Sequence, residues 1–317
     1  MKNKYAHYAA KDLIILQIEQ LIKTYFSFFW KRKTGVNYQA IYSSEPKKSN
    51  LCLFSAFSHG NIAEYGYYYL SEIMKLEMDV VYISASKISD IDRNKLIKIG
   101  IIQIIEKENI MPDFSAWKIG LELNDYGMNC DSVLLANDSV FGPLFNLKDC
   151  VNEMQARKSD FWGMTDSFSL KYHLQSYFLW FNQSVISSIA WESFWKKLKT
   201  YTDKKVVIYR YETRFTQYFL KRGFTSDSFI KYTDFEEEIL RVDKKYKNCN
   251  YLIYMWKELI EEKKFPFLKR SIVEYEKIRT MLFHEINHDW KSALMNSTSY
   301  PIDYILKYLK NADKDRR

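Results

Sequence analysis

The chain has 317 residues, of which 47% are hydrophobic, so it can bury the core of one large α/β domain with an appendage, or of two domains. Its formal net charge of +8 lies at the ends: residues 1–50 carry nine basic against three acidic side chains, residues 300–317 carry five against three, and the remainder is neutral. This distribution argues against a nucleic-acid-binding protein, whose positive charge lines the folded binding face. The four cysteines are widely spaced and form no CxxC pair, which excludes a zinc ribbon and gives no disulfide framework.

The first predicted element is a helix over residues 8–33. Its apolar side chains recur in steps of three and four, which places them on one face: Ile14, Ile18, Leu21, Ile22 and Tyr25. Aromatic residues 28–30 followed by basic residues 31–33 are typical of an interfacial membrane anchor. A helix packed on the domain surface with a solvated basic end is the alternative. Residues 34–49, which are rich in serine and lysine and contain Pro46, are predicted to be a linker.

From residue 51 the chain alternates between predicted strands and helices, at spacings that suit βαβ units and a parallel sheet. The predicted strands are 51–57, 79–84, 101–105, 132–136, 161–164, 176–181 and 206–209. The predicted helices are 63–76, 90–99, 113–123, 185–199 and 212–222. After about residue 230 the pattern becomes helical and more charged. We therefore expect a basic helical arm and linker over 1–49, an α/β domain over 50–235 and a helical extension over 236–317.

The most informative stretch of the predicted sheet is CDSVLLANDSVFGPL, residues 130–144. Residues 132–136 form a short uncharged apolar run, as expected for a strand buried on both faces. The run ends in Asn137, Asp138 and Ser139, which places a carboxylate at the carboxyl edge of the sheet, where open α/β folds bind ligands. A carboxylate flanked by an amide and a hydroxyl suits a hard cation that bridges to a diphosphate. Capping of the following turn is the alternative role of Asp138.

Polar clusters also follow other predicted strands, and loops at the carboxyl ends of parallel strands converge at one edge. His59 follows the first strand, and Asp113 opens the helix over 113–123, where it would serve as an N-cap in the simplest interpretation. A further cluster, over 160–175, contains Trp162, Asp166, His173 and Gln175.

Seven stretches, in order over residues 51–270, resemble the rhamnan synthesis protein F family of bacterial glycosyltransferases, which build cell-surface polysaccharides. They are HGNIAEYGYYYL (59–70), PDFSAWKIGL (112–121), VLLANDSVFGPL (133–144), DFWGMTDS (160–167), HLQSYFLWF (173–181), YETRFTQYFLKRGF (211–224) and PFLKR (266–270). The string NDSVFGPL with a downstream HLQSYF is the most specific part. Residues 1–45 and 275–317 fall outside the resemblance.

The resemblance implies a GT-A-like nucleotide-sugar-binding fold, Rossmann-like, with a mostly parallel sheet flanked by helices. In such folds an acidic motif after a central strand holds a divalent cation, Mg²⁺ or Mn²⁺, and the donor diphosphate. Asp138 matches this metal-binding position, although the chain has a single Asp in Asn-Asp-Ser instead of an Asp-x-Asp pair. The donor-binding residues are then expected to be His59, Asp113, Trp117, Lys118, Asn137, Asp138 and Ser139.

Inverting transferases of this fold use a carboxylate as general base on the acceptor hydroxyl. Glu212 lies eleven residues before Gly223, a spacing similar to that of the catalytic acid in related GT-A enzymes. A first-turn Glu favoured by the helix dipole is the alternative explanation, and Asp166 is the second candidate for the base. His173, Gln175 and Trp162 are expected to contact the acceptor or a phosphate. A structural His that donates to a backbone carbonyl, and an aromatic core, are the alternatives.

One further motif, HEINH at residues 284–288, fits the HExxH signature of zinc proteases. Such a site needs a third ligand. No Glu follows Glu285, and the position of the metzincin glycine is occupied by Lys291, so we do not expect a zinc protease.

These observations predict a glycosyltransferase that moves a sugar, such as L-rhamnose or another deoxysugar, from a nucleotide-diphosphate donor to a growing surface polysaccharide or lipid-linked glycan. The alternative is a non-catalytic scaffold module of a polysaccharide assembly complex. Without a signal-peptide pattern or an apolar run of about 18 residues, we expect a cytoplasmic protein. Residues 8–33 would contact the inner face of the cytoplasmic membrane, and no nucleic-acid partner is expected.

Overall fold

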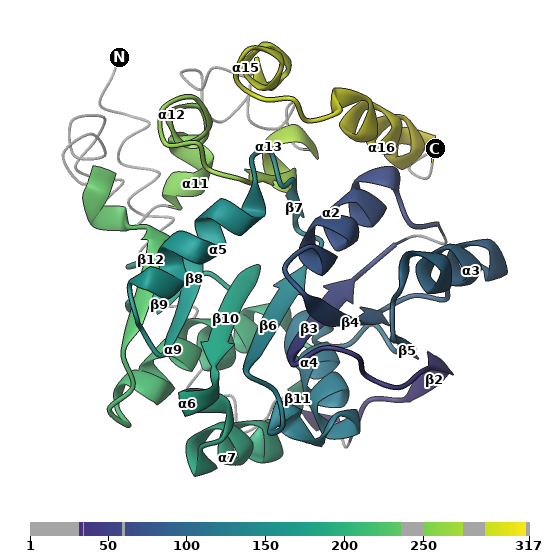
Figure 1. The fold of residues 1–317 in the computed structure, drawn as a ribbon, viewed down its shortest axis with the longest axis vertical. Helices are drawn as coiled ribbons and strands as arrows, with labels where there is room; N and C mark the ends of the chain where they lie inside the picture. Colours follow the sequence, from purple (N-terminus) through teal and green to yellow (C-terminus); the bar gives the residue numbers. More distant parts are fainter. Residues whose placement is uncertain (1–31, 34, 59–60, 236–249, 275–288, 315–317) are drawn as a thin grey trace.

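A nine-stranded sheet forms the centre of the computed structural model, which describes residues 32–33, 35–58, 61–235, 250–274 and 289–314 (Figure 1). In sheet order the strands are β12 (Ser226–Ile230), β8 (Phe161–Ser167), β10 (Phe178–Asn182), β6 (Ser132–Asn137), β3 (Asn50–Ala56), β4 (Met78–Ser84), β5 (Gln103–Lys107) and β2 (Tyr38–Ser43), with β9 (His173–Leu174) paired to β8. Six of the nine strands run in one direction, and β2, β9 and β10 run in the other. The predicted α/β class with a mostly parallel sheet is confirmed.

Helices cover both faces of this sheet, and for this reason its central strands are apolar throughout. Alternate side chains of β3 enter opposite cores: Cys52 and Phe54 pack on one face, and Leu51 and Leu53 on the other. The first face is covered by α2 (Glu64–Met74), α3 (Asp90–Ile99) and α5 (Leu147–Ala156), seen in front in Figure 1. The second is covered by α4 (Pro112–Leu123), α6 (Gln183–Ile186), α7 (Ile189–Lys197) and α9 (Thr213–Leu220).

Local signals set the bounds of several elements, and α3 illustrates this best. The Ser89 side chain accepts a hydrogen bond from the Asp92 N–H and so caps the start of the helix. Gly100, at φ 102°, ends it in the left-handed conformation that glycine adopts without strain. The predicted bounds, 90–99, are therefore confirmed.

The predicted linker over residues 34–49 is wrong in its central part. Residues 38–43 form β2, which pairs antiparallel with β5 at the edge of the sheet. Upstream, the predicted helix over 8–33 lies mostly outside the described residues. Its last two residues instead form β1 (Arg32–Lys33), which pairs with β11 (Thr200–Tyr201).

The predicted strand over 206–209 is also wrong, because this segment is helical. It comprises α8 (Lys204–Val207) and a π-helical turn, η3 (Ile208–Glu212). The β-branched residues of this segment indicate a strand by propensity. The Asp203 carboxylate accepts from the N–H groups of Lys205 and Val206, and this cap starts a helix instead. The predicted helix over 185–199 is divided into α6 and α7, and Ser188 caps the second of them.

The C-terminal part of the chain packs against the loop that follows β6. There β13 (Leu268–Lys269) pairs antiparallel with β7 (Val140–Phe141). The remaining helical elements are η2 (Asp125–Gly127), η4 (Tyr232–Phe235), α11 (Tyr251–Tyr254), α12 (Trp256–Glu261), α13 (Arg270–Glu274), α15 (Trp290–Ser297) and α16 (Ile302–Lys314). A separate apolar cluster joins α12, α15 and α16 to Tyr65 of α2 and Phe141 of β7. In the described ranges, every helix is too short or too polar to cross a membrane.

Candidate active site

Three carboxylates from separate segments interact at the carboxyl ends of the parallel strands. Asp138 directly follows β6, Asp113 lies in the first turn of α4 after β5, and Glu212 precedes α9. The negative charges of Asp138 and Glu212 both raise the pKa of Asp113, so each of them acts on Asp113. The structure therefore brings together three residues that the sequence analysis selected.

The parallel pairing of β3 and β6 positions Asp138. Its backbone N–H donates to the Ser55 carbonyl at 3.2 Å, and its carboxylate Oδ2 accepts from the Phe57 N–H at 3.2 Å. Burial raises the pKa of Asp138, whereas the positive charge of Arg270 and the Phe57 hydrogen bond lower it. Capping of the turn, the alternative role for Asp138, is carried out by Asn137, whose Oδ1 accepts from the Ser139 N–H at 3.1 Å and from the Ser139 hydroxyl at 2.7 Å.

Arg270 is the principal partner of Asp138. Its guanidinium Nη1 lies 3.2 Å from Asp138 Oδ2 and donates to the Asp138 carbonyl oxygen at 2.9 Å, and the side chains of both residues are 20% exposed. Its Nη2 donates to Glu274 Oε1 at 3.0 Å and to the Tyr308 hydroxyl at 2.8 Å. Arg270 is the last residue of the stretch PFLKR, which belongs to the family resemblance, but no motif or spacing in the sequence predicts a role for it.

Asp113 has the most strongly altered chemistry of the three carboxylates. Burial is the largest cause of its raised pKa, which lies at about 7; Asp138 and Glu212 raise it further, and the Ser55 hydroxyl and Lys107 oppose them. Burial in turn lowers the pKa of Lys107 to about 8, and its ammonium group donates to the backbone carbonyl of Glu108 at 2.8 Å. Asp113 is not the N-cap of α4, as the simplest interpretation held, because Met111 occupies that position. Near pH 7, Asp113 can therefore either donate or accept a hydrogen bond.

Glu212 is held by a single described hydrogen bond between side chains. The Ser176 hydroxyl, on the connection between β9 and β10, donates to Glu212 Oε1 at 3.1 Å. The π-helical turn η3 ends at Glu212 and α9 begins at the next residue. A carboxylate oriented in this way can accept a proton from a hydroxyl that approaches from the sheet edge.

A cluster of protein ligands does not accompany Asp138, the residue predicted to bind a divalent cation, among the described residues. In the described part of the chain, no group of three or more His, Cys, Asp or Glu side chains is placed to hold a metal ion. Asp138 Oδ2, the expected ligand atom, already meets the Phe57 N–H and the Arg270 guanidinium. The expectation of Mg²⁺ or Mn²⁺ at Asp138 therefore stays a prediction, and Arg270 is the positive charge that the described structure places beside Asp138.

The predicted tryptophan contacts with sugars are corrected. Trp117 is fully buried, and its Nε1 donates to the Ala136 carbonyl at 3.2 Å. Trp162 is fully buried as well and stacks on Trp180 with ring centroids 5.6 Å apart. Neither ring offers a face to a ligand, because both fill the core. Lys118 forms an ion pair with Glu122 and donates to the Trp195 carbonyl at 3.1 Å, so it is directed toward α7.

Other predicted site residues form a buried polar network around β8 and β9. His173 Nδ1 hydrogen-bonds to the Lys171 carbonyl at 2.7 Å, which is the structural alternative considered for it. Gln175 Oε1 accepts from the Thr165 hydroxyl at 2.7 Å. Asp166 accepts from the Tyr232 N–H at 2.6 Å, and burial raises its pKa to about 6. His59 and the HEINH motif lie outside the described residues.

Comparison with known proteins places the chain in a family. It is 29% identical over 185 residues to the uncharacterized protein y4gN of Sinorhizobium fredii, a match that covers 57% of this chain and only 48% of y4gN. It is 27% identical over 225 residues to the virulence protein VirA of Vibrio anguillarum, covering 61% and 72% of the two chains. A solved structure of a presumed nucleotide-diphospho-sugar transferase from Desulfovibrio desulfuricans G20 superimposes with a TM-score of 0.34 at 11% identity, over 63% of this chain and 93% of the other.

The sequence profile of rhamnan synthesis protein F matches residues 80–316. This match begins within β4 and extends through α16, so it includes the C-terminal helices that the resemblance of individual stretches left outside. Because the match spans most of the 317 residues, the chain belongs to the rhamnan synthesis protein F family.

Proposed function

We propose that this protein is a glycosyltransferase that moves a sugar from a nucleotide-diphosphate donor to a growing surface polysaccharide or a lipid-linked precursor of one. Family membership supports the reaction class. The observation that carries the assignment of residues is that Asp138 and Glu212 both raise the pKa of Asp113 at one edge of the sheet. Ligand sites of open α/β folds lie at this edge.

Arg270 would bind the diphosphate of the donor, and Asp138 would orient the Arg270 guanidinium. A guanidinium group presents several N–H donors in a planar fork that matches two oxygen atoms of a phosphate. An incoming diphosphate would compete with Asp138 and Glu274 for the N–H groups of Arg270. The positive charge would then stabilise the negative charge that develops on the leaving group.

Glu212 would act as the general base. The acceptor hydroxyl transfers its proton to Glu212 as its oxygen bonds to the anomeric carbon, and the bond between that carbon and the diphosphate oxygen breaks with its electron pair on the diphosphate. Attack from the side opposite the leaving group inverts the anomeric configuration. Asp113, which titrates near pH 7, would hydrogen-bond to a hydroxyl of the donor sugar, for which L-rhamnose or another deoxysugar is our proposal.

The test measures hydrolysis of, and transfer from, a panel of nucleotide-sugars by the purified protein. We expect Asp138→Asn and Glu212→Gln each to lower kcat by about 100-fold or more, because the first weakens the ion pair that orients Arg270 and the second removes the base. Asp131→Asn is the matched control, since this exposed Asp lies just before β6, at the opposite end of the strand from Asp138. Unchanged turnover in either site variant would remove that residue from the mechanism.

A non-catalytic scaffold is the second candidate function. Two observations favour it: the chain has one Asp in place of an Asp-x-Asp pair, and Asp138 is already paired with Arg270. Calorimetry against the same nucleotides separates the two functions. Nucleotide binding without turnover of any donor and acceptor in the panel would favour the scaffold.

A further inference from the structure

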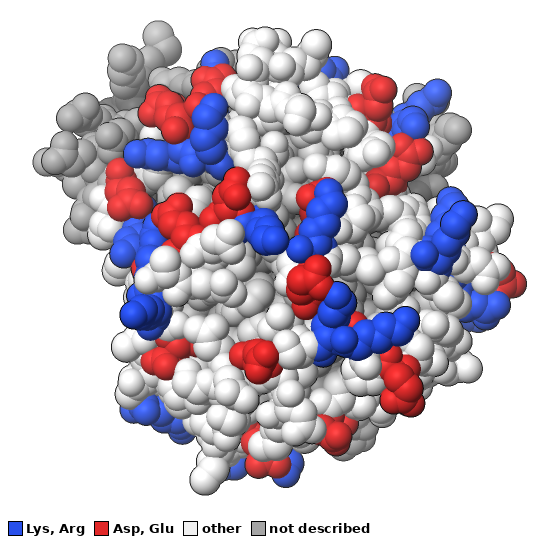
Figure 2. Space-filling model, in the orientation of Figure 1, with Lys and Arg blue, Asp and Glu red and all other residues white. Residues whose placement is uncertain are grey.

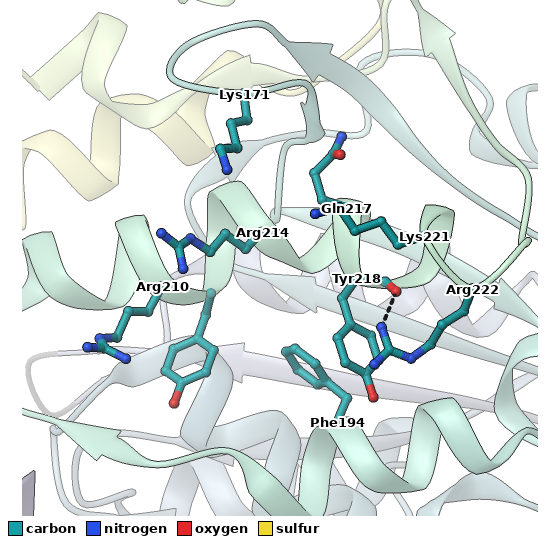
Figure 3. Close-up of a pocket in the computed structure, with 9 residues that line it drawn as sticks. Lys171, Phe194, Arg210, Arg214, Gln217, Tyr218, Lys221 and Arg222 are labelled. Carbon is teal, nitrogen blue, oxygen red and sulfur yellow. Dashed lines mark hydrogen bonds between the residues drawn. The ribbon is translucent and has the colours of Figure 1, made fainter. Parts of the chain in front are cut away.

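A cleft with a volume of about 350 Å³ runs along η3 and α9 (Figure 3). We refer to it as the basic cleft, because the residues that line it are Lys171, Phe194, Arg210, Tyr211, Arg214, Gln217, Tyr218, Lys221 and Arg222. Five of these nine residues are cations, and none of the described lining residues is a carboxylate. The charged residues of this set are Lys171, Arg210, Arg214, Lys221 and Arg222, so every charge that lines the cleft is positive.

Helical periodicity creates this basic surface. Thr213, Phe215, Thr216 and Phe219 are the residues that α9 buries against the sheet. The intervening positions Arg214, Gln217, Tyr218 and Lys221 recur in steps of three and four and therefore share the outer face. In Figure 3, Lys171 extends from the loop before β9 toward this face, and Phe194 approaches it from α7.

Aromatic rings orient the arginines of the basic cleft. The Arg214 guanidinium lies over the Tyr209 ring, 4.4 Å from its centroid, and that of Arg222 lies 3.5 Å from the centroid of Tyr218. Arg222 Nη1 also donates to the Tyr218 carbonyl at 2.8 Å, as Figure 3 shows. These contacts restrict the arginine side chains to fewer conformations before a ligand binds. The side chains therefore lose less conformational entropy on binding.

Three cations of the basic cleft lack the carboxylate partners that several other cations in the described part of the chain have. Figure 2 shows acidic and basic side chains next to one another on the face that it presents. Ion pairs such as Arg157–Glu153 and Lys307–Glu64 occur in the described part of the chain. In the described part of the chain, no carboxylate lies within 4.0 Å of the charged groups of Lys171, Arg214 or Lys221, and the buried Arg214 Nε has no hydrogen-bond partner there. Neighbouring like charges repel one another, so an anion in the cleft would relieve this repulsion.

Tyr211 connects the basic cleft to the candidate active site. Tyr211 lines the cleft, and the next residue is Glu212. The Tyr211 ring also packs against Phe114 with centroids 5.6 Å apart, and Phe114 follows Asp113. A ligand held in the cleft by its charged end would therefore keep the rest of its length close to the carboxylate that we assign as the base.

We propose that the basic cleft binds a phosphate or diphosphate ester group on the acceptor. Several cations in a small cleft favour a multiply charged group over a single carboxylate, and Phe194 and Tyr218 give the neighbouring, uncharged part of the ligand an apolar wall. Naming this ligand an acceptor rests on the proposed function, whereas the binding of a phosphate group in the cleft does not.

The first test is a calorimetric titration of inorganic pyrophosphate into the full-length protein. We expect the variant Arg214→Gln/Lys221→Gln to bind it about tenfold more weakly or worse than the wild type. The control Lys87→Gln/Lys98→Gln removes two exposed charges near α3, across the sheet from α9, and should bind like the wild type. Arg214→Lys, which keeps the charge but loses the planar fork, should fall between them. Equal affinity of the cleft variant and the control would overturn the proposal.

The second test distinguishes the source of the phosphate group. The same variants are sedimented with vesicles of phosphatidylglycerol mixed with phosphatidylcholine, and with phosphatidylcholine vesicles alone. Weaker binding of the cleft variant to both pyrophosphate and the anionic vesicles supports a lipid-borne phosphate. Weaker pyrophosphate binding with unchanged vesicle binding supports a soluble phosphorylated acceptor, and no loss in either assay contradicts the proposal. Turnover of nucleotide-sugars is measured separately in the wild type, so its absence would refute the proposed function without affecting the result for the cleft.

Discussion

The surroundings of Asp113 in the folded protein determine its pKa, and its position in the sequence does not reveal them. Burial, Asp138 and Glu212 raise its pKa to about 7, well above the ordinary value of an Asp side chain. The folded protein therefore binds this proton more tightly than the unfolded chain does. The resulting contribution to stability is fully present below about pH 4, decreases as the pH rises, and is lost above about pH 7.

Asp113→Asn should flatten this dependence on pH, because the amide keeps the shape of the protonated acid and cannot ionise. The variant and the wild type should have similar free energies of unfolding at pH 4, whereas at pH 8 the variant should be more stable by up to about 4 kcal/mol, because each unit of the raised pKa corresponds to about 1.4 kcal/mol. Urea denaturation at both pH values measures the difference, with Asp131→Asn as a control for the loss of an exposed carboxylate. A difference between variant and wild type that stays constant with pH would contradict the raised pKa.

At the scale of elements, helix α16 is tied to the candidate active site through Tyr308. The Tyr308 hydroxyl accepts from Arg270 Nη2 at 2.8 Å and donates to Glu274 Oε1, and its ring packs edge-on against Tyr65 and Phe141. A helix near the C-terminus thus helps to orient the guanidinium that faces Asp138.

Tyr308→Phe should keep the ring packing and remove both hydrogen bonds of the hydroxyl. We expect a loss of about 1–2 kcal/mol in the free energy of unfolding, because Arg270 and Glu274 each lose a partner in a partly buried network. Tyr304→Phe on the same helix is the control, since within the described residues its hydroxyl has no hydrogen-bond partner and its ring contacts Tyr68 and Tyr300. If both variants lost the same stability in thermal denaturation, the hydroxyl network would have no measurable role.

At the scale of the whole molecule, positive charge is concentrated in the first 50 residues and in the last turns of the chain. Residues 8–31, the main part of the predicted amphipathic arm, lie outside the described residues, so membrane contact through them stays a prediction. The structure shows where the arm must be cut to test it: residues 38–43 form the edge strand β2 and have to be kept.

Deleting residues 1–31 should weaken co-sedimentation with anionic liposomes, because it removes the aromatic residues and part of the basic cluster of the arm. High salt should weaken binding of the full-length protein in the same way, because screening reduces the attraction between exposed charges and the membrane surface. If the truncated and full-length proteins sedimented equally with liposomes, the membrane role of the arm would be wrong.

Much of the α/β domain could be predicted from the sequence, because its signals are local. Apolar runs such as residues 132–136 identify buried strands, and the helix over 90–99 is delimited by a serine cap and a glycine that lie within one turn of its ends. Asp113, Asp138 and Glu212 were selected from strand ends, helix starts and a family resemblance, and each of these signals covers only a few neighbouring residues.

Only the tertiary structure decided which groups face one another. Arg270 reaches Asp138 across 132 residues of sequence, Trp117 and Trp162 are enclosed in the core, and residues 206–209 are helical despite their preference for strands. The cations of the basic cleft lie close together because α9 buries its apolar face and exposes its basic residues on the opposite face. Propensities and caps act between neighbours along the chain, whereas pairing and burial depend on contacts between segments that are distant in the sequence and adjacent only after folding.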